Sequence, residues 1–272
     1  MSTKYVFVDI DGTLLSHHTG IPRSALEAID IARRNGHKIF INTGRVKSAV
    51  DDLLQFYPFD GFVFACGGHV EVNGDVLYKN ELTEDEIKKA LEIFETKNIG
   101  YVLEGPNISY YNDDAIEFFR KRRVRDEKEL GPQVTRHLVQ ENMVYPIKHY
   151  YEDPQPVNKF SLFTKTNVEL YEIEQLFGED YEVIKYETSG EIITRGINKS
   201  HGMRTVLKHF NADIKDTMAL GDSMNDYSMV KDAEVGIAMG NGVDQLKAIA
   251  TYTTFDVDDH GLYHAFKKFG LI

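Results

Sequence analysis

Two carboxylates end a buried apolar run near the N-terminus of the chain. Residues 5–8 are Tyr-Val-Phe-Val, and Asp9 and Asp11 follow with one residue between them. An unbroken apolar run of this length is typical of a strand that is buried on both faces of a parallel sheet. A carboxylate is costly to bury there without positive charge. We therefore expect a cation as the partner of this acid pair.

Other polar residues follow an expected strand or begin an expected helix: Thr43, Gly44, Lys199, Asp222, Asn225 and Asp226. In a doubly wound sheet, the carboxyl ends of the parallel strands converge on one crevice. Carboxylate oxygens are ligands that suit Mg²⁺. Helix N-termini and a lysine suit the oxygens of a phosphoryl group. The pattern predicts a site for Mg²⁺ and a phosphate group at this edge of the sheet.

Strands and helices alternate at both ends of the chain, which favours βαβ units and a parallel sheet. We expect strands at 5–8, 38–42, 61–65, 191–194, 217–220 and 235–238, and helices near 25–32, 46–55, 199–210 and 243–250. The expected fold class is therefore α/β, with a doubly wound, Rossmann-like parallel sheet.

The middle of the chain has a different rhythm. Residues 70–78 alternate with period two around Asn73-Gly74, which indicates a hairpin with a type I′ turn. A capping box at 83–86 opens a helix that reaches about residue 97. Further strands are expected at 101–104, 108–111, 159–165 and 181–186, and helices at 113–123 and 168–177. We predict an α+β domain of residues 83–187, inserted into a core of residues 1–82 and 188–272.

Composition narrows the classes of function. The chain has 272 residues, 42% of them hydrophobic, and a formal net charge of −12. This charge argues against nucleic acid and anionic membranes as partners. Cys66 is the single cysteine, so no internal disulfide forms and a cytoplasmic location is expected. We find no signal-peptide pattern and no apolar run of membrane-spanning length. The sequence gives no information on oligomeric state.

Taken in order, these motifs resemble those of the haloacid dehalogenase superfamily. The four motifs are Asp9-Ile10-Asp11-Gly12-Thr13, Thr43-Gly44-Arg45, Lys199 and residues 221–226. Residues 236–242 and 259–261 are similar to the Cof-type branch of that superfamily. The resemblance covers nearly the whole chain. It implies a large α/β cap between the second and third motifs, where we placed the inserted domain.

The resemblance also implies what each residue does. Asp9 would be the nucleophile that takes up the phosphoryl group, and Asp11 would be the acid and base. Mg²⁺ would be held by Asp9, the backbone carbonyl of Asp11, and Asp222. Phosphate and substrate would be bound by Thr43, Gly44, Lys199 and Asn225. Asp226 would orient Lys199 or a metal-bound water.

The implied activity is Mg²⁺-dependent hydrolysis of a small phosphorylated metabolite through an aspartyl-phosphate. Sugar phosphates, nucleotides and phosphorylated cofactors all remain open as substrates. A second acid at Asp11 favours phosphate esters over organic halides, because an alcohol leaving group needs a proton. Two alternatives stay open: a phosphomutase, and a non-catalytic sensor of a phosphorylated ligand. A sensor is expected to lack the nucleophile or a metal ligand, and neither is missing.

Several residues allow two interpretations. Arg45 either reaches the substrate or lies on the surface. The basic run 120–125 is either a solvated helix end or a positive lip that attracts phosphorylated substrates. The cluster Tyr145, Tyr150 and Tyr151 either lines the cap or, as we expect, packs in its core. Cys66 stands where the family commonly has Asn, so we infer no function for that loop.

Overall fold

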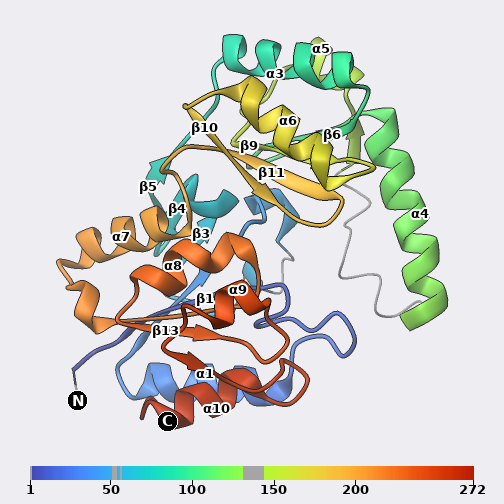
Figure 1. Ribbon diagram of the computed structural model, residues 1–272. Helices are drawn as coiled ribbons and strands as arrows, with labels where there is room; N and C mark the ends of the chain where they lie inside the picture. The colour runs from blue at the N-terminus through green and yellow to red at the C-terminus, as the bar shows by residue number, and fades with distance from the viewer. Residues whose placement is uncertain (1, 51–53, 56, 131–143) are drawn as a thin grey trace. The chain divides into compact units, whose positions relative to one another are not determined.

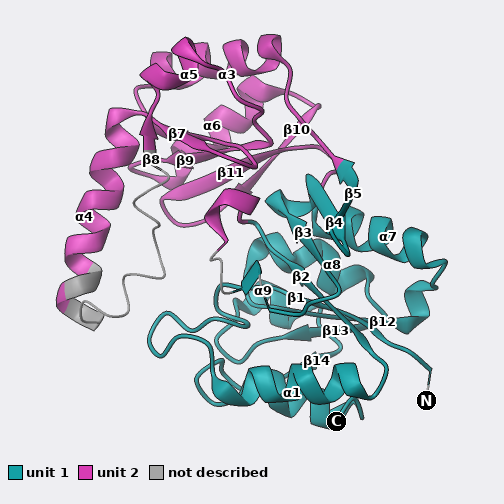
Figure 2. Cartoon of the chain, turned by 180° about the vertical axis from the view of Figure 1, so that it is seen from behind, with its two compact units in different colours: residues 1–44, 52–78, 198–272 teal, residues 45–51, 79–197 magenta. Residues whose placement is uncertain are grey.

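A computed structural model describes residues 2–50, 54–55, 57–130 and 144–272 of the chain (Figure 1). The chain divides into two compact units (Figure 2). The first unit comprises residues 1–44, 52–78 and 198–272, and the second comprises 45–51 and 79–197. The sequence placed the domain boundaries at 82/83 and 187/188 and kept residues 45–51 in the core.

The first unit is built on an eight-stranded sheet in the order β14-β13-β12-β1-β2-β3-β4-β5. Its strands are β1 Tyr5–Val8, β2 Lys38–Asn42, β3 Gly61–Phe64, β4 His69–Val72, β5 Asp75–Lys79, β12 Thr217–Gly221, β13 Val235–Ala238 and β14 Tyr252–Thr253. The strands from β14 to β3 are parallel, and β4 is antiparallel to β3. From β1 the sheet first grows toward β2 and β3 on one side. Later in the chain, β12 pairs with β1 on its other side, and β13 and β14 follow. The doubly wound α/β fold expected from the sequence is confirmed.

Helices cover both faces of this sheet (Figure 1). They are α1 Arg23–Arg34, α7 Lys199–Phe210, α8 Tyr227–Asp232, α9 Asp244–Lys247 and α10 Gly261–Lys268. On one face, α7 and α8 pack on β1, β2 and β3 in a single apolar cluster that includes Phe7, Phe40 and Met203. On the other face, α1 and α10 lie side by side.

Two local features of the first unit agree with the sequence-based predictions: the burial of β1 and the turn between β4 and β5. Val6, Phe7 and Val8 are fully buried, as expected for a central parallel strand. The turn between β4 and β5 has positive φ at both Asn73 (52°) and Gly74 (87°). Type I′ turns require this conformation at both central residues, so the predicted hairpin is confirmed.

The second unit is built on a six-stranded sheet in the order β10-β11-β9-β6-β7-β8. Its strands are β6 Gly100–Glu104, β7 Ser109–Tyr111, β8 Val144–Pro146, β9 Lys159–Phe163, β10 Tyr181–Lys185 and β11 Ser189–Thr194. All pairings are antiparallel except β7 with β8. The helices are α3 Glu84–Lys97, α4 Asp113–Leu130, α5 Lys148–Glu152 and α6 Asn167–Phe177.

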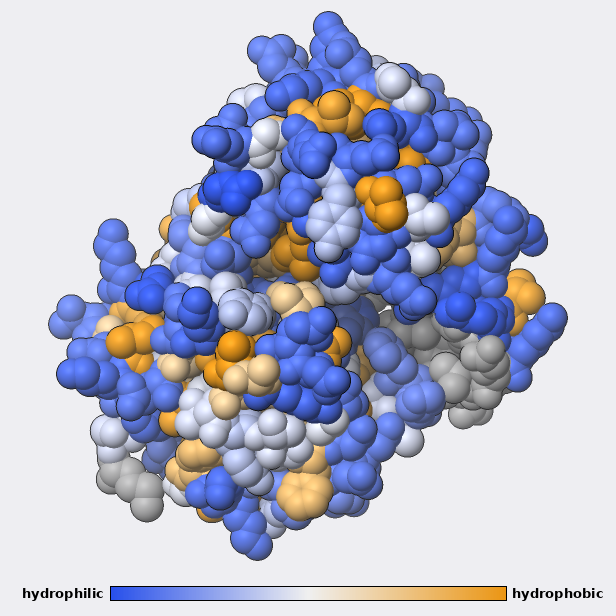
Figure 3. Space-filling view, in the orientation of Figure 1, coloured by the Kyte–Doolittle hydropathy of each residue, from blue (hydrophilic) through white to orange (hydrophobic). Residues whose placement is uncertain are grey.

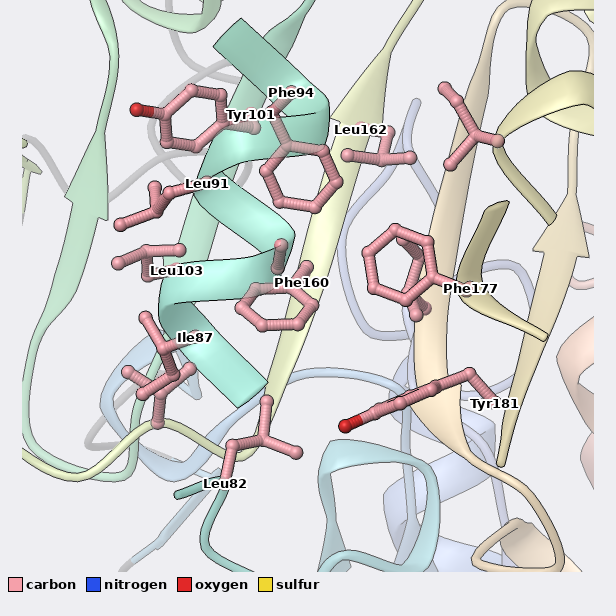
Figure 4. Close-up of a cluster of buried hydrophobic side chains, with 14 of the residues drawn as sticks. Leu82, Ile87, Leu91, Phe94, Tyr101, Leu103, Phe160, Leu162, Phe177 and Tyr181 are labelled. Atoms are coloured by element: carbon pink, nitrogen blue, oxygen red, sulfur yellow. The ribbon is translucent and has the colours of Figure 1, made fainter. Parts of the chain in front are cut away.

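The core of the second unit lies between one face of its sheet and the helices α3 and α6 (Figure 4). Phe94 of α3 packs edge-on against Phe160 of β9, with ring centroids 5.4 Å apart, and also against Phe177 of α6. The start of α3 has the capping box that the sequence indicated, formed by Thr83 and Glu86.

The structure corrects several sequence-based expectations. The strand at 189–194 is antiparallel to β9 and β10 in the second unit, and does not begin the return to the parallel sheet. A short apolar run in the sequence predicts a strand but does not indicate which of the two sheets it joins. Among the described residues of the helix expected over 46–55, Lys47–Ala49 form a 3₁₀ helix, Val50 is extended, and residues 54–55 are α-helical as expected. Residues 51–53 lie outside the described residues.

The remaining differences concern element ends and surfaces. The helix expected over 113–123 continues to Leu130, so the basic run 120–125 lies inside α4 and not at its end. The helix expected over 243–250 is the shorter α9. The sequence did not indicate β8, α5, α8, β14 or α10. Of the three tyrosines Tyr145, Tyr150 and Tyr151, Tyr150 is buried, but Tyr145 and Tyr151 are 40% and 58% exposed, so the expected core packing is wrong for these two.

The visible face of the molecule is mostly hydrophilic, with scattered apolar residues (Figure 3). Within the described residues, every helix is too short or too polar to cross a bilayer.

Shortening a side chain at the centre of the hydrophobic core of the second unit tests how that core is packed. Phe94 is fully buried, so Phe94→Ala should lower the free energy of unfolding by about 3–5 kcal/mol. Val168 of α6 is 65% exposed, and Val168→Ala should change it by less than about 0.5 kcal/mol. Urea denaturation followed by circular dichroism measures both variants. Equal effects of the two substitutions would contradict this description of the core.

Candidate active site

The site lies where the two halves of the parallel sheet meet. Asp9 follows β1 and Asp222 follows β12, and these strands are parallel neighbours with Val8 opposite Leu220. The backbone N–H of Asp9 still donates to the carbonyl of Leu220, at 3.1 Å. The two acids therefore leave the sheet side by side at its carboxyl edge. This is the switch point of a doubly wound sheet, where such folds bind ligands.

A fully buried lysine connects the acids. Lys199 is the first residue of α7, and its Nζ donates to Asp9 Oδ1 at 2.7 Å and to Asp226 Oδ1 at 2.6 Å. The side chains of Lys199 and Asp226 are both 0% exposed. Asn42 at the end of β2 donates from Nδ2 to the carbonyl of Lys199, at 2.9 Å. The start of α7 is thus tied to both β1 and β2.

Asp226 uses both of its carboxylate oxygens inside the protein. Oδ1 accepts from Lys199, and Oδ2 accepts from the backbone N–H groups of Asp222 and Ser223, each at 2.9 Å. Gly221 makes room for this arrangement, since a Cβ there would lie 2.3 Å from the Asp226 Cγ. Asp226 therefore fixes the Asp222 loop and the lysine together.

Asp222 packs against the backbone of the loop that carries Asp9. Gly12 has φ of +80°, and a Cβ at Gly12 would lie 2.4 Å from Asp222 Oδ2. Only glycine satisfies both the conformation and the close approach. Thr13 Oγ1 donates to Asp222 Oδ1 at 3.4 Å. Asn241, which follows β13, donates from Nδ2 to the Gly12 carbonyl at 2.8 Å.

Negative charge exceeds positive charge in this group. Asp9, Asp222 and Asp226 each offer an oxygen within 4.8 Å of the others, and Lys199 is their ammonium partner. Burial raises the pKa of Asp9 to about 8, although Lys199 opposes the rise. Burial, then Asp226 and Asp9, raise the pKa of Asp222 to about 9. The nearby Asp11 carboxylate adds to both shifts.

The lysine itself stays protonated. Burial lowers the pKa of Lys199, but the adjacent Asp226 and Asp9 carboxylates outweigh burial and leave the pKa raised. Three carboxylates around one ammonium leave room for a second positive charge. Because the available donors are carboxylate oxygens, a hard divalent cation such as Mg²⁺ fits the site.

The other expected residues lie at the same edge of the sheet or nearby in sequence. Thr43 follows β2, and its backbone N–H donates to the Val63 carbonyl at 2.8 Å. Gly44 is buried beside it. Asn225 accepts from Ser223 Oγ at 2.9 Å. The hydrogen bonds described above unite Asp9, Lys199, Asp222 and Asp226 directly.

Arg45 belongs to the second compact unit, where its Nη1 donates to the Ala49 carbonyl at 3.1 Å. The basic run is exposed on α4, where Arg120 makes an ion pair with Glu117. The run is therefore solvated, as the first interpretation expected, but it lies within α4 and not at the end of a helix.

Cys66 adopts a left-handed conformation, with φ of 53°, and is buried. Asn tolerates this conformation better than most residues, so the Asn that the family resemblance implies at this position would suit the backbone here. The Cys66 N–H donates to the Thr43 carbonyl at 3.0 Å. The next residue, Gly67, packs against α7, since a Cβ there would lie 2.1 Å from the Asn198 carbonyl oxygen.

Sequence reasoning gave no function to Asn42, Thr13 or Asn241, which the structure places around the site. A signal was present for two of them. Asn42 ends a buried strand directly before Thr43, and Asn241 follows another strand between two glycines. A polar residue at the carboxyl end of a parallel strand is a candidate for the ligand crevice.

Comparison with known proteins gives one consistent result. The model of a family described as haloacid dehalogenase-like hydrolase matches residues 6–266. YkrA of Bacillus subtilis (strain 168) is 30% identical over 275 residues, which cover 100% of both chains. The 5-amino-6-(5-phospho-D-ribitylamino)uracil phosphatase YitU of the same organism is 28% identical and covers 99% of both. The structure of the HAD subclass IIB sugar phosphatase BT4131 has a TM-score of 0.81 at 28% identity, covering 99% of this chain and 100% of that one.

Removing the buried ammonium should destabilise the first unit. Lys199→Met leaves the buried Asp226 carboxylate without its partner and removes the hydrogen bond to Asp9, which should cost about 3–5 kcal/mol at pH 7.5 in the presence of chelator. Adding Asp226→Asn removes the buried charge and should recover part of the loss. Urea denaturation of the single and double variants measures both effects. A double variant that is no more stable than Lys199→Met would contradict this charge balance.

The acid cluster should also make stability depend on pH. Both carboxyl pKa values are raised from 3.8, to about 8 for Asp9 and about 9 for Asp222, so the folded state holds these protons more tightly than the unfolded state. Their stabilising contribution is complete below about pH 4 and is lost as pH rises through about 8–9. In chelator, the melting temperature should therefore fall between pH 6 and pH 9.

The same cluster predicts how metal and substitution change this profile. Saturating Mg²⁺ should flatten the fall, because the cation replaces the protons. Asp222→Asn should also flatten it without metal. Differential scanning fluorimetry across this pH range measures all three profiles. A wild-type profile in chelator that matches that of Asp222→Asn would show that Asp222 does not titrate in this range.

Proposed function

The chain belongs to the haloacid dehalogenase-like hydrolase family, and from this we propose that it is a Mg²⁺-dependent phosphatase that forms an aspartyl-phosphate on Asp9. The family resemblance drawn from the motifs is confirmed by the match over residues 6–266. Phosphatase activity is the activity that its relatives and structural neighbours carry in their names. One observation supports the proposed mechanism above all: the buried ammonium of Lys199 is hydrogen-bonded to Asp9 at the switch point of the sheet.

In the first step, a carboxylate oxygen of Asp9 attacks the phosphorus of the ester. The bond between phosphorus and the alcohol oxygen breaks, and Asp11 gives its proton to that oxygen. The product is an alcohol and an acyl phosphate on Asp9. A covalent intermediate replaces one difficult displacement by water with two easier steps.

In the second step, a water molecule attacks the phosphorus of the acyl phosphate. Asp11, now a carboxylate, takes the proton of that water. The bond between phosphorus and the Asp9 oxygen breaks, which returns the Asp9 carboxylate and releases inorganic phosphate. One acid/base residue therefore serves both steps.

The chain supplies positive charge and orientation around the phosphoryl group. Lys199 would contact its oxygens, and Thr43, Gly44 and Asn225 would add hydrogen bonds. Asp226 would hold Lys199 in position, since both of its oxygens are already occupied inside the protein. Asp9, Asp222 and the backbone carbonyl of Asp11 would hold Mg²⁺, which supplies further positive charge to the phosphoryl oxygens.

The substrate would be a small phosphorylated metabolite. Relatives act, by name, on a phosphoribitylamino uracil and on sugar phosphates. A phosphatase transfers the phosphoryl group to water, whereas a phosphomutase returns it to a sugar, so product analysis separates the two. The single cysteine favours a cytoplasmic location. The net charge of −12 argues against nucleic acid as a partner.

Replacement of the nucleophile tests the mechanism. Asp9→Asn should lower kcat for release of inorganic phosphate by at least about a thousandfold, because the amide cannot form the acyl phosphate. Asp75→Asn changes an exposed acid of β5 and should leave the rate unchanged. Chelator should abolish wild-type activity, and added Mg²⁺ should restore it. Phosphate release is measured over sugar phosphates, nucleotides and phosphorylated cofactors. Full activity of Asp9→Asn, or of the chelated enzyme, would refute the proposed mechanism.

A further inference from the structure

A polar pocket lies at the amino edge of the parallel sheet, opposite to the edge that carries the acids. It has a volume of about 410 Å³, and its lining includes Asp30, Arg33, Arg34, His37, Lys38 and Asp60. All of these residues belong to the first unit. Lys38 begins β2, whereas Thr43 follows it, so this pocket and the acids lie at opposite ends of the same strands. We call it the α1 pocket, because half of this lining comes from the last two turns of α1.

Some of the charges in the lining are already used by the fold. The Asp60 carboxylate makes ion pairs with Arg33 at 3.2 Å and with Lys38 at 3.1 Å. Asp30 Oδ1 accepts a hydrogen bond from Tyr57 Oη at 2.7 Å. These contacts join the end of α1 and the start of β2 to the segment before β3. They therefore fix the walls of the α1 pocket.

Arg34, the last residue of α1, takes no part in these contacts. It is exposed, and within the described residues its guanidinium forms neither a hydrogen bond nor an ion pair. Asp30 lies four residues earlier on the same helix, where a partner for Arg34 would be expected, but its side-chain hydrogen bond goes to Tyr57. The N–H donors of Arg34 can therefore bind a ligand. An exposed arginine is common on protein surfaces, so this feature alone does not indicate a site.

A buried histidine in the same lining provides the second observation. His37 is only 6% exposed, and its Nδ1 accepts from the backbone N–H of Lys4 at 3.1 Å. Burial, and then the charge of Lys4, lower the pKa of His37 from 6.5, so the ring is neutral and carries its proton on Nε2. Among the residues that the structure describes, none accepts a hydrogen bond from this Nε2. A buried donor without an acceptor costs free energy, which an acceptor atom on a bound molecule would offset.

The charge of the lining indicates what kind of molecule it would accept. Two arginines and a lysine face two carboxylates there, so the α1 pocket has one excess positive charge, whereas the whole chain has a net charge of −12. Two of these cations, Arg33 and Arg34, also offset the partial negative charge at the end of α1. Guanidinium groups bind phosphate and carboxylate groups through paired N–H···O bonds. The lining therefore favours an anion with oxygen acceptors.

We propose that the α1 pocket binds a small molecule through an oxyanion group, either a phosphate or a carboxylate. Arg34 would form an ion pair with this group, and His37 Nε2 would donate a hydrogen bond to an oxygen of the bound molecule. A volume of about 410 Å³ is in the range of small-molecule sites and leaves room for more than the anionic group. The site would be separate from the one proposed for catalysis, so this inference does not rest on the proposed function.

Charge reversal at Arg34 tests the proposal. Arg34→Glu replaces the excess positive charge of the lining by an excess negative charge. Arg23→Glu is the matched control, because Arg23 is the first residue of the same helix and its side chain is 92% exposed. Both substitutions change the net charge of the protein equally, so they separate a local contact from a long-range effect. Both arginines are exposed, so both variants should fold, which circular dichroism checks.

Nuclear magnetic resonance of the ¹⁵N-labelled protein would follow titrations with inorganic phosphate and with succinate, in chelator and at constant ionic strength. In wild type, the amide signals of Gly36 and Lys38 and the ring signals of His37 should shift and saturate with at least one anion, with Kd below about 10 mM. Arg34→Glu should raise this Kd at least about tenfold, because repulsion replaces attraction. Arg23→Glu should keep it within about twofold.

The anion that binds more tightly identifies phosphate or carboxylate as the recognised group. Three results would overturn the proposal: shifts at these residues that do not saturate, shifts confined to Asp9, Lys199 and their neighbours, or a Kd that the two substitutions change equally. Any of these would show that the α1 pocket holds only the ion pairs of the fold. None of them bears on phosphatase activity, which is measured separately by phosphate release.

Discussion

The first unit depends on one fully buried ammonium. Lys199 is shared between Asp9 and Asp226, and a lysine without contact to water is stable only with such partners. The ion pairs require the start of α7 to lie against the carboxyl ends of β1 and β2. Two glycines allow this approach: a Cβ at Gly202 would lie 2.2 Å from Val63 Cγ1, and one at Gly67 would meet the Asn198 carbonyl. Close helix–sheet packing and charge pairing therefore support each other.

The single ammonium of Lys199 does not balance the three carboxylates Asp9, Asp222 and Asp226 that surround it. Asp222 is held close by Gly12, Thr13 and the Asp226 loop, although burial raises its pKa. Under the proposed function, a cation and a phosphate group would offset the free-energy cost of holding these carboxylates together. Because hydrogen bonds and close backbone packing already hold the carboxylates together, the proposed binding would require little reorganisation.

The two sheets differ in where they carry their polar side chains. The parallel sheet of the first unit is covered on both faces, so its polar residues gather where the strands end, as Asp9 and Asp222 do. The antiparallel sheet of the second unit buries one face under α3 and α6 and carries Glu104, Lys159 and Glu191 in the middle of the other. Polar groups therefore gather at the strand ends in the first unit and on one sheet face in the second.

The sequence by itself determined the elements whose signals are local. Examples are the buried run of β1, the type I′ turn at Asn73-Gly74 and the capping box of α3. It also indicated the acids at the strand ends, because a parallel sheet brings such ends to one edge. Tertiary structure alone decided contacts between distant segments: the Lys199 ion pairs, the Asn241 bond to the Gly12 carbonyl, and the partners of β11. The physical reason is that hydrophobic periodicity specifies which face of a strand is buried, whereas its neighbour in the sheet is chosen by packing over the whole unit.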